Sequence, residues 1–108
     1  MLQHSIDERG VVTLTLDCPQ LHNAFDDALI VELIRVLGLY AANSEARLLV
    51  LRANGKSFSA GADLNWMQRV AQYSFDENKL DAEQLAELME RLYRFPCPTI
   101  AVVQGAAF

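Results

Sequence analysis

Apolar and polar residues alternate at the start of the chain, which is the pattern of a β-strand with one buried face. One alternating run covers residues 2–6, and a second covers residues 12–16. Between them, Glu8-Arg9-Gly10 offers a glycine for a tight turn. The pattern therefore predicts a β-hairpin at the start of the chain.

The next segment, residues 26–42, places apolar side chains at the spacing of a helix with one buried face. Either Asn23 or Asp26 can cap its start, because both side chains accept hydrogen bonds from free N–H groups. We interpret the apolar stripe as core rather than as a ligand site; it consists of Leu29, Leu33, Val36, Leu37 and Tyr40.

Two more helices are expected further along the chain. A short one covers residues 63–70. A long one begins at Ser74-Phe75-Asp76-Glu77, which matches a capping box, and ends near Arg94. The apolar face of the long helix is predicted to consist of Leu85, Leu88, Met89 and Leu92.

Apolar, β-prone residues at 48–52 and 99–103 predict two buried strands. Pro96 and Pro98 end the long helix and force an extended entry into the second of these strands. Because strand–helix–strand connections are right-handed crossovers, we predict an α/β fold with a parallel sheet. Ligands of such sheets bind beyond the carboxyl ends of the strands, which directs attention to the loop after residue 52.

That loop is rich in small residues and leads into the short helix. Gly61 permits a tight turn, and Asp63 can cap the helix while neighbouring backbone N–H groups stay free. Free N–H groups at such a junction can bind an anion or a developing oxyanion. On these residues alone, an ordinary capped loop is the more common explanation of Gly61-Ala62-Asp63.

Composition restricts the classes of function. A formal charge of −5 opposes a nucleic-acid surface, and no apolar run approaches the roughly 18 residues of a membrane span, so neither partner is expected. The start of the chain lacks a secretory signal, which favours a cytoplasmic location. Cys18 and Cys97 lack metal-ligand or redox spacing, and His4 and His22 lack a catalytic partner, so we expect no metal site. Nucleotide hydrolysis and NAD chemistry are excluded because the glycine motifs that they need are absent.

Three sequence blocks together resemble the enoyl-CoA hydratase/isomerase (crotonase) superfamily. The blocks are Cys18-Pro19-Gln20-Leu21-His22-Asn23-Ala24-Phe25, Phe58-Ser59-Ala60-Gly61-Ala62-Asp63-Leu64 and Pro98-Thr99-Ile100-Ala101-Val102-Val103-Gln104-Gly105-Ala106-Ala107-Phe108. The resemblance implies crotonase-like ββα repeats with a parallel sheet, of which this chain is the amino-terminal portion of the spiral. We expect residues 1–108 to be the first part of a single domain, truncated before the glycine triplet of the family.

The resemblance also implies a reaction, the addition of water to an α,β-unsaturated acyl-CoA thioester through an enolate. Two backbone N–H groups receive the enolate charge, and the Ala62 N–H is carried over as the first of them. The substrate-binding residues implied in the same way are Ala24, Ala60, Gly61, Asp63, Leu64 and Asn65. CoA is part of the substrate, so no separate cofactor is expected, and the implied assembly is a homotrimer or a dimer of trimers.

Leu64-Asn65-Trp66-Met67 is similar to the methylglutaconyl-CoA hydratase-like branch, which suggests a branched or carboxylated acyl group such as 3-methylglutaconyl. Trp66 and Met67 can line the acyl pocket, although core positions are more common for such residues. Lys56 and Arg52 are candidates to bind the CoA phosphates, although solvated side chains explain each of them singly.

Other activities stay open because the family glutamates that move protons lie beyond residue 108. The same oxyanion site serves isomerases, dehalogenase-like enzymes and thioester hydrolases of the superfamily. A non-catalytic CoA-binding or oligomerisation module is the alternative from a different class. Acidic residues at Asp26, Asp27, Glu32 and on the long helix are interpreted as helix caps and solvated charges.

Overall fold

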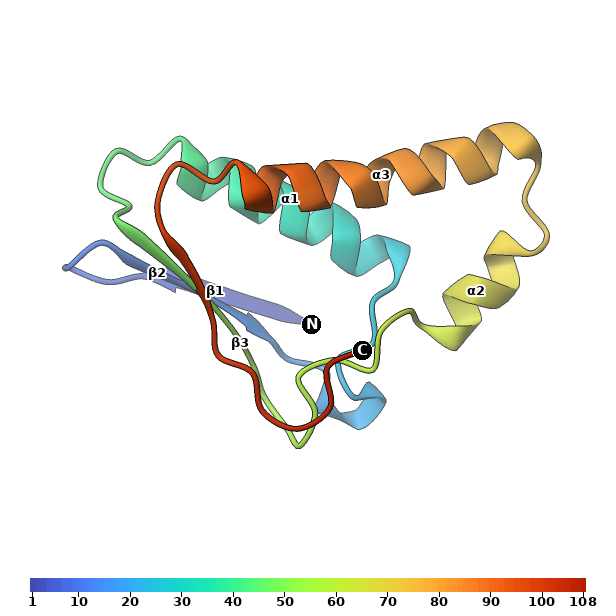
Figure 1. The fold of residues 1–108 in the computed structure, drawn as a ribbon, viewed down its shortest axis with the longest axis horizontal. Coiled ribbons are helices and arrows are strands. Elements are labelled where there is room, and N and C mark those ends of the chain that lie inside the picture. The colour runs from blue at the N-terminus through green and yellow to red at the C-terminus, as the bar shows by residue number, and fades with distance from the viewer.

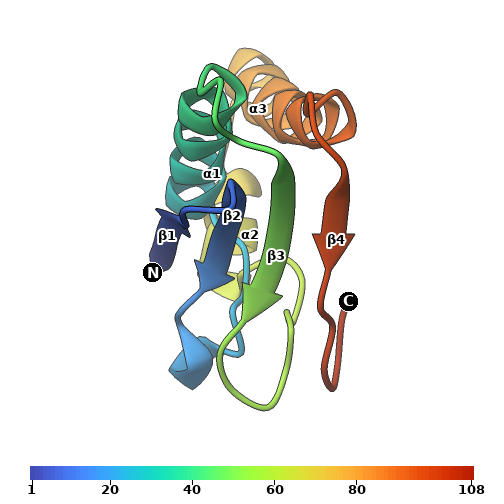
Figure 2. The ribbon, with the colours of Figure 1, turned by 90° about the vertical axis from the view of Figure 1, so that its left-hand side faces the viewer.

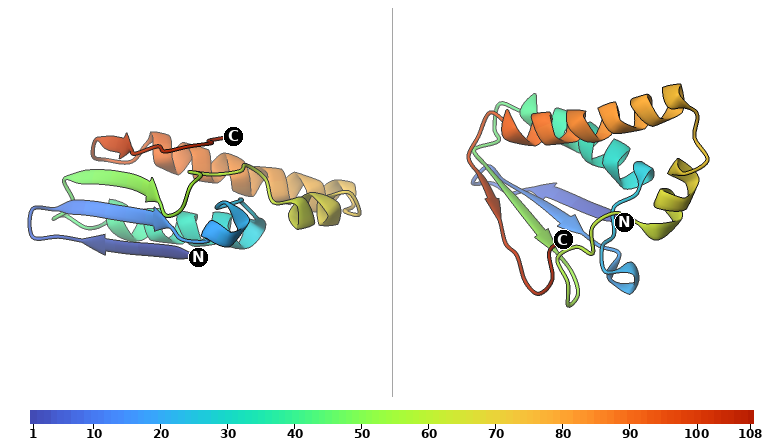
Figure 3. Two further views of the ribbon diagram at one scale, coloured as in Figure 1. Left: turned by 90° about the horizontal axis from the view of Figure 1, so that it is seen from below. Right: turned by 45° about the vertical axis from the view of Figure 1, so that its right-hand side comes forward.

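The computed structural model describes residues 1–108 as a mixed four-stranded sheet with its helices on one side (Figures 1 and 3). The strands are β1 (Leu2–Ile6), β2 (Val11–Leu16), β3 (Leu48–Ala53) and β4 (Thr99–Ala101), in the spatial order β1-β2-β3-β4 (Figure 2). The helices are the 3-10 turn η1 (Pro19–Leu21), α1 (Asp27–Ala41), α2 (Leu64–Val70) and α3 (Phe75–Tyr93). β1 and β2 are antiparallel, whereas β2, β3 and β4 are parallel, so the predicted α/β fold is confirmed.

The hairpin that joins β1 to β2 is fixed by Asp7 and Gly10. The Asp7 carboxylate accepts hydrogen bonds from the backbone N–H groups of Arg9 and Val11. The Val11 hydrogen bond, followed by that of the Arg9 side chain, lowers the pKa of Asp7. Gly10 has a φ of 83°, and a Cβ here would collide with the Glu45 carbonyl oxygen.

The core lies between the helix side of the sheet and α1. All five residues of the predicted stripe on α1 are buried, and Ile30 joins them. They pack against Val12, Leu14 and Leu16 of β2 and Leu49 of β3, each no more than 1 % exposed. Each fully buried side chain of this size contributes about 1.5–3 kcal/mol, so this layer anchors the loops that follow the strands.

The predicted helix bounds differ slightly from the observed ones because the first residues act as caps. Asp26, Asp63 and Ser74 have extended backbones, and each side chain accepts a hydrogen bond from the first turn of its helix. The capping box of Ser74 and Glu77 is present as predicted. None of the helices is both long and apolar enough to cross a membrane.

β4 is shorter than predicted, because it ends at Ala101 rather than at residue 103. Its three residues pair with β3, and the Val102 N–H still donates to the Leu51 carbonyl. Beyond that point, Nε2 of Gln104 donates to the carbonyl oxygens of Ala53 and Gly55, at 2.8 and 2.9 Å. A side chain thus satisfies carbonyl groups that a longer strand would have paired.

The predicted apolar face of α3 is only partly buried. Leu88 is 3 % exposed and Leu92 is half-buried, whereas Leu85 and Met89 are exposed. α3 lies along α1 (Figure 1), and only the residues that point at α1 are covered. All three residues of β4 are also exposed.

Asn23 joins two loops at the carboxyl end of the sheet. Its Oδ1 accepts from the Cys18 N–H at 2.8 Å, and its Nδ2 donates to the carbonyls of Asn54 and Ser57 at 2.8 and 3.1 Å. The residue is 1 % exposed and has a φ of 54°. Of the two caps proposed for α1, only Asp26 has that role, and Asn23 instead ties the segment before α1 to the loop after β3.

We predict that Asn23→Ala lowers the free energy of unfolding by about 2 to 3 kcal/mol, because it leaves buried backbone groups without partners. Urea denaturation of the intact protein measures this loss. The control is Gln3→Ala, which removes one exposed hydrogen bond to Asp17 and is expected to cost no more than about 0.5 kcal/mol. Equal losses in the two variants would show that Asn23 does not hold the loops together.

Candidate active site

The candidate oxyanion donor lies in the loop between β3 and α2, where Ala62 pairs with the segment that precedes α1. The Phe25 N–H donates to the Gly61 carbonyl at 2.7 Å, and the Asp63 N–H donates to the Phe25 carbonyl at 2.6 Å. Phe25 and Ala62 thereby form an isolated parallel bridge. In such a bridge the two neighbours of Ala62 are bonded to Phe25, and its own N–H points the other way. The Ala62 N–H makes no hydrogen bond within the chain.

Gly61 makes the turn that presents Ala62. Its φ of 87° lies in the region that favours glycine. Its N–H donates to Oγ of Ser59 at 3.1 Å, and that hydroxyl donates to the Asn23 carbonyl at 3.0 Å. Ser59 is buried, and its hydroxyl links this turn to Asn23, the residue that joins the two loops.

The carboxyl end of the chain lies beside this turn, as Figure 1 shows. Ser59 donates its N–H to the Ala106 carbonyl and accepts from the Phe108 N–H, which forms a second parallel bridge. Gly105 has a φ of 60°, and a Cβ there would collide with the Lys56 carbonyl. Three segments that are far apart in sequence therefore converge around Gly61 and Ala62.

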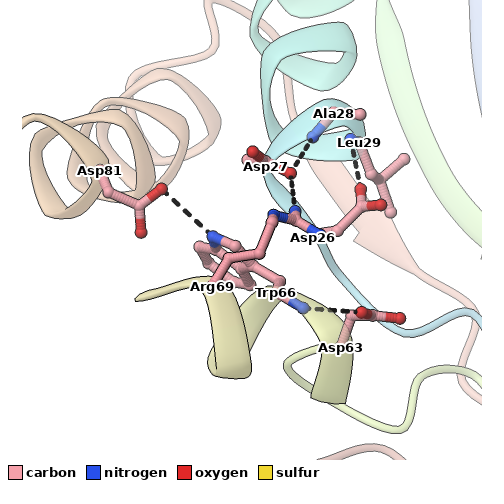
Figure 4. Close-up of polar contacts among 8 residues, drawn as sticks. All are labelled: Asp26, Asp27, Ala28, Leu29, Asp63, Trp66, Arg69 and Asp81. Atoms are coloured by element: carbon pink, nitrogen blue, oxygen red, sulfur yellow. Dashed lines mark hydrogen bonds and ion pairs between the residues drawn. The ribbon is translucent and has the colours of Figure 1, made fainter. Parts of the chain in front are cut away.

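Asp63 has the capping role that the sequence suggested. One carboxylate oxygen accepts from the Trp66 N–H at 3.0 Å, as Figure 4 shows. This bond places a negative charge at the start of α2 and satisfies one of its free N–H groups. The N–H groups of Leu64 and Asn65 in the same first turn have no hydrogen-bond partner.

A groove with a volume of about 530 Å³ runs past Ala62. It is lined by Gln20, Leu21, His22, Ala24, Ala60, Ala62, Asp63, Leu64 and Asn65. Six of the seven site residues named from the sequence are in this set, and Gly61 lies next to them in the turn. Three of the lining residues are alanines, which leave the backbone close to anything that binds in the groove.

A second, apolar cavity of about 340 Å³ is lined by the same turn. Its lining residues are Phe25, Phe58, Ser59, Gly61, Ala62, Trp66, Leu85, Met89, Ala107 and Phe108, none of them charged. Ala62 lines both the groove and the apolar cavity, and its N–H is free of partners within the chain. The sequence analysis did not anticipate most of this lining, which comes from three loop segments, α2 and α3 and has no common spacing.

Trp66 and Met67 have different surroundings. Trp66 is 7 % exposed and is both a core residue and part of the apolar cavity. Met67 is 53 % exposed and does not line the apolar cavity. The residue pair expected from the sequence is therefore divided, with only the tryptophan facing the candidate acyl site.

The candidate cations for the CoA phosphates lie in different places. Arg52 lines a separate hollow with Asn54, Gly55, Val102 and Gln104 and does not line the groove. Lys56 is exposed in the loop near the groove. His22 does line the groove, and its Nδ1 lies 3.3 Å from Oγ of Ser57. Sequence reasoning missed His22 as a groove residue because only its contacts, and not its spacing, place it there.

The remaining polar residues are explained by the fold. His4 hydrogen-bonds through Nδ1 to the hydroxyl of the buried Tyr40 at 2.8 Å. Most of the acidic residues near arginines form exposed ion pairs, such as Glu32 with Arg35 at 2.8 Å. The described residues therefore provide a backbone N–H without a partner and two hollows lined in part by Ala62, whereas no pair of acidic side chains lines either hollow.

Known proteins resemble this chain in sequence and in fold. An enoyl-CoA hydratase from Shewanella pealeana superposes with a TM-score of 0.96 at 50% identity, over 99% of this chain and 40% of that one. The 2,3-dehydroadipyl-CoA hydratase of Escherichia coli K12 is 34% identical over 103 residues, which are 93% of this chain and 37% of the relative. The 1,2-epoxyphenylacetyl-CoA isomerase of the same organism is 33% identical over 101 residues, 93% of this chain and 38% of that relative.

The chain spans about two fifths of the length of these relatives. The match to the enoyl-CoA hydratase/isomerase family covers residues 7–108, and it includes all three sequence blocks as well as the loop that presents Ala62. The chain belongs to the enoyl-CoA hydratase/isomerase family.

Proposed function

We propose that the intact protein is an enoyl-CoA hydratase that adds water to an α,β-unsaturated acyl-CoA thioester. The observation that carries this proposal is the free N–H of Ala62, a residue that lines both the groove and the apolar cavity. A thioester whose carbonyl oxygen lies at this N–H can extend its CoA arm along the groove and its acyl chain into the apolar cavity.

The reaction accumulates charge on the thioester oxygen. When water adds to the β-carbon, the electron pair of the double bond moves through the α-carbon and forms an enolate. The Ala62 N–H donates to the oxygen more strongly as that charge develops, which lowers the barrier. One such donor contributes about 3 to 4 kcal/mol. The second donor and the groups that move protons are proposed to come from the family segment that follows the third sequence block.

The other assignments made from the resemblance are retained as proposals. Ala24 and Ala60 contact the CoA arm, and Asp63, Leu64 and Asn65 adjoin the thioester from the start of α2. CoA arrives as part of the substrate, so the reaction needs no separate cofactor or metal. We propose one domain that continues beyond the glycine triplet, a cytoplasmic location and a trimer or a pair of trimers.

The acyl group is proposed to be apolar or methyl-branched. The resemblance suggested a branched or carboxylated group such as 3-methylglutaconyl, and the apolar lining of the cavity supports the uncharged choice. None of the ten residues that line it in this chain is a lysine, arginine or histidine, so this part of the site offers no partner to a terminal carboxylate.

A double-bond isomerase is the second candidate, supported by the comparable identities to a hydratase and an isomerase. Both reactions pass through an enolate, so the Ala62 donor serves either one. Incubation of the intact protein with crotonyl-CoA and with a 3-enoyl-CoA distinguishes them. Loss of absorbance of the conjugated double bond indicates hydration, and gain of that absorbance indicates isomerisation. A non-catalytic CoA-binding module would give neither change.

We predict that Ala62→Pro lowers kcat by about 10²- to 10³-fold, because it removes the N–H donor. The dissociation constant of a saturated acyl-CoA is expected to change by less than about threefold, since this donor acts mainly in the transition state. Ala62→Ser is the matched control, because it keeps the N–H and is expected to retain most of the activity. Unchanged turnover in the proline variant would contradict the assignment.

We predict that Gly61→Val also abolishes most turnover, since a β-branched residue is strained at a φ of 87° and would displace the Ala62 N–H. Gly61→Asn is the comparison, because asparagine tolerates positive φ better than other residues that have a side chain. Steady-state kinetics on both variants, with melting temperatures as a check of folding, measure the effect. Wild-type activity in the valine variant would show that this turn does not present the donor.

A further inference from the structure

Trp66 is the single tryptophan of the 108 residues, and it is held at two points. Its backbone N–H donates to Oδ1 of Asp63 at 3.0 Å. Its indole Nε1–H donates to Oδ1 of Asp81 on α3 at 3.2 Å. Figure 4 shows the indole reaching from α2 toward Asp81. The orientation of the ring is therefore set by a polar contact as well as by packing.

The helix that carries Trp66 is fixed to α1 as well as to α3. Nη2 of Arg69 lies 2.7 Å from Oδ1 of Asp27, at the first residue of α1 (Figure 4). The preceding residue, Asp26, caps α1, and Phe25 before it forms the bridge to Ala62. A shift of α2 relative to Ala62 would therefore break contacts at both ends of the helix.

Trp66 lines the apolar cavity together with Ala62 and with Leu85 and Met89 of α3. Asp81 lies one helical turn before Leu85, so its carboxylate is next to the cavity lining without belonging to it. An acyl chain in the apolar cavity meets the indole, and the charge that it approaches beyond the indole is negative.

We propose that Trp66, positioned by Asp81, is the specificity-determining residue of the acyl site. The indole limits the length of the acyl chain, and Asp81 adds a negative charge that disfavours acyl groups with a terminal carboxylate. This inference rests on the proposed function, because it assumes that the acyl chain occupies the apolar cavity. It assigns the substrate class as short, apolar enoyl-CoA thioesters.

The experiment compares kcat/KM of the intact protein for crotonyl-CoA, trans-2-octenoyl-CoA and glutaconyl-CoA. Trp66→Phe removes the second ring and the indole donor, so the octenoyl-to-crotonyl ratio is expected to rise by about tenfold, the scale of one to two methylenes in a pocket. Met67→Leu is the matched control on the same helix, because Met67 is exposed and does not line the apolar cavity. The octenoyl-to-crotonyl ratio of Met67→Leu is expected to equal that of the wild type.

Asp81 is tested by two substitutions. Asp81→Asn keeps an acceptor for the indole and removes the charge, so the chain-length ratio is expected to stay at the wild-type value. The glutaconyl-to-crotonyl ratio is expected to rise by about threefold, because the substitution removes one solvent-screened negative charge that repels the substrate carboxylate. Asp81→Ala frees the indole, and the octenoyl-to-crotonyl ratio is expected to rise as in Trp66→Phe.

Wild-type chain-length ratios in both Trp66→Phe and Asp81→Ala would overturn the proposal, and so would equal wild-type turnover of glutaconyl-CoA and crotonyl-CoA. If Trp66→Phe does not fold, as judged by its melting curve, Asp81→Ala alone decides, because Asp81 is only partly buried.

Indole fluorescence separates this proposal from the proposed function. Butanoyl-CoA and octanoyl-CoA are titrated into the wild type and into Trp66→Phe, and the difference gives the Trp66 emission. A chain-length-dependent change in that emission supports the Trp66 contact even if no thioester is turned over, which would refute only the hydratase assignment. No change in Trp66 emission on binding, or no binding, overturns the acyl contact.

Discussion

Two backbone hydrogen bonds to Phe25 determine where the Ala62 N–H points, and the candidate site is built around that orientation. Phe25 accepts from Asp63 and donates to Gly61, so the residue between them has no partner in this direction. Phe25 is followed at once by the cap of α1, and α1 is anchored in the core. The position of the donor is thus coupled through one residue to the most buried part of the structure.

The loop conformation that this bridge requires is costly by itself. His22 and Asn23 have positive φ, which residues other than glycine adopt less readily in the unfolded chain. Such conformations persist where the surroundings over-determine them. Here the three side-chain hydrogen bonds of Asn23 and the hydroxyl of Ser59 supply those constraints from inside the loops. An amide held this way needs little reorganisation when charge develops, which is the condition for effective oxyanion stabilisation.

Elements governed by local pattern could be predicted from the sequence, as α1 and the capping box of α3 illustrate. The residues of the α1 stripe recur at helical spacing, and Ser74 and Glu77 lie in one turn, so the local sequence is enough to predict each element. The end of β4 depends instead on Gln104, whose side chain bonds to carbonyls about fifty residues away. The apolar cavity is harder to predict from the sequence, because Phe25, Trp66 and Met89 come together only when α2 and α3 have packed in the folded structure. The family resemblance located the groove residues, but the apolar cavity became visible only in the structure.

Asp63 presents an electrostatic conflict, since its carboxylate lies one residue after the proposed donor to an enolate. A like charge near a developing oxyanion opposes it, yet this carboxylate is engaged by the Trp66 N–H in the first turn of α2. That hydrogen bond holds the Asp63 carboxylate against the first turn of α2, where the helix dipole partly offsets its negative charge. The Ala62 N–H points away from the Phe25 bridge, whereas the Asp63 N–H points toward it. Alternation along the extended backbone thus gives neighbouring N–H groups different partners, and the proposed donor remains available to the substrate while its neighbour maintains the loop.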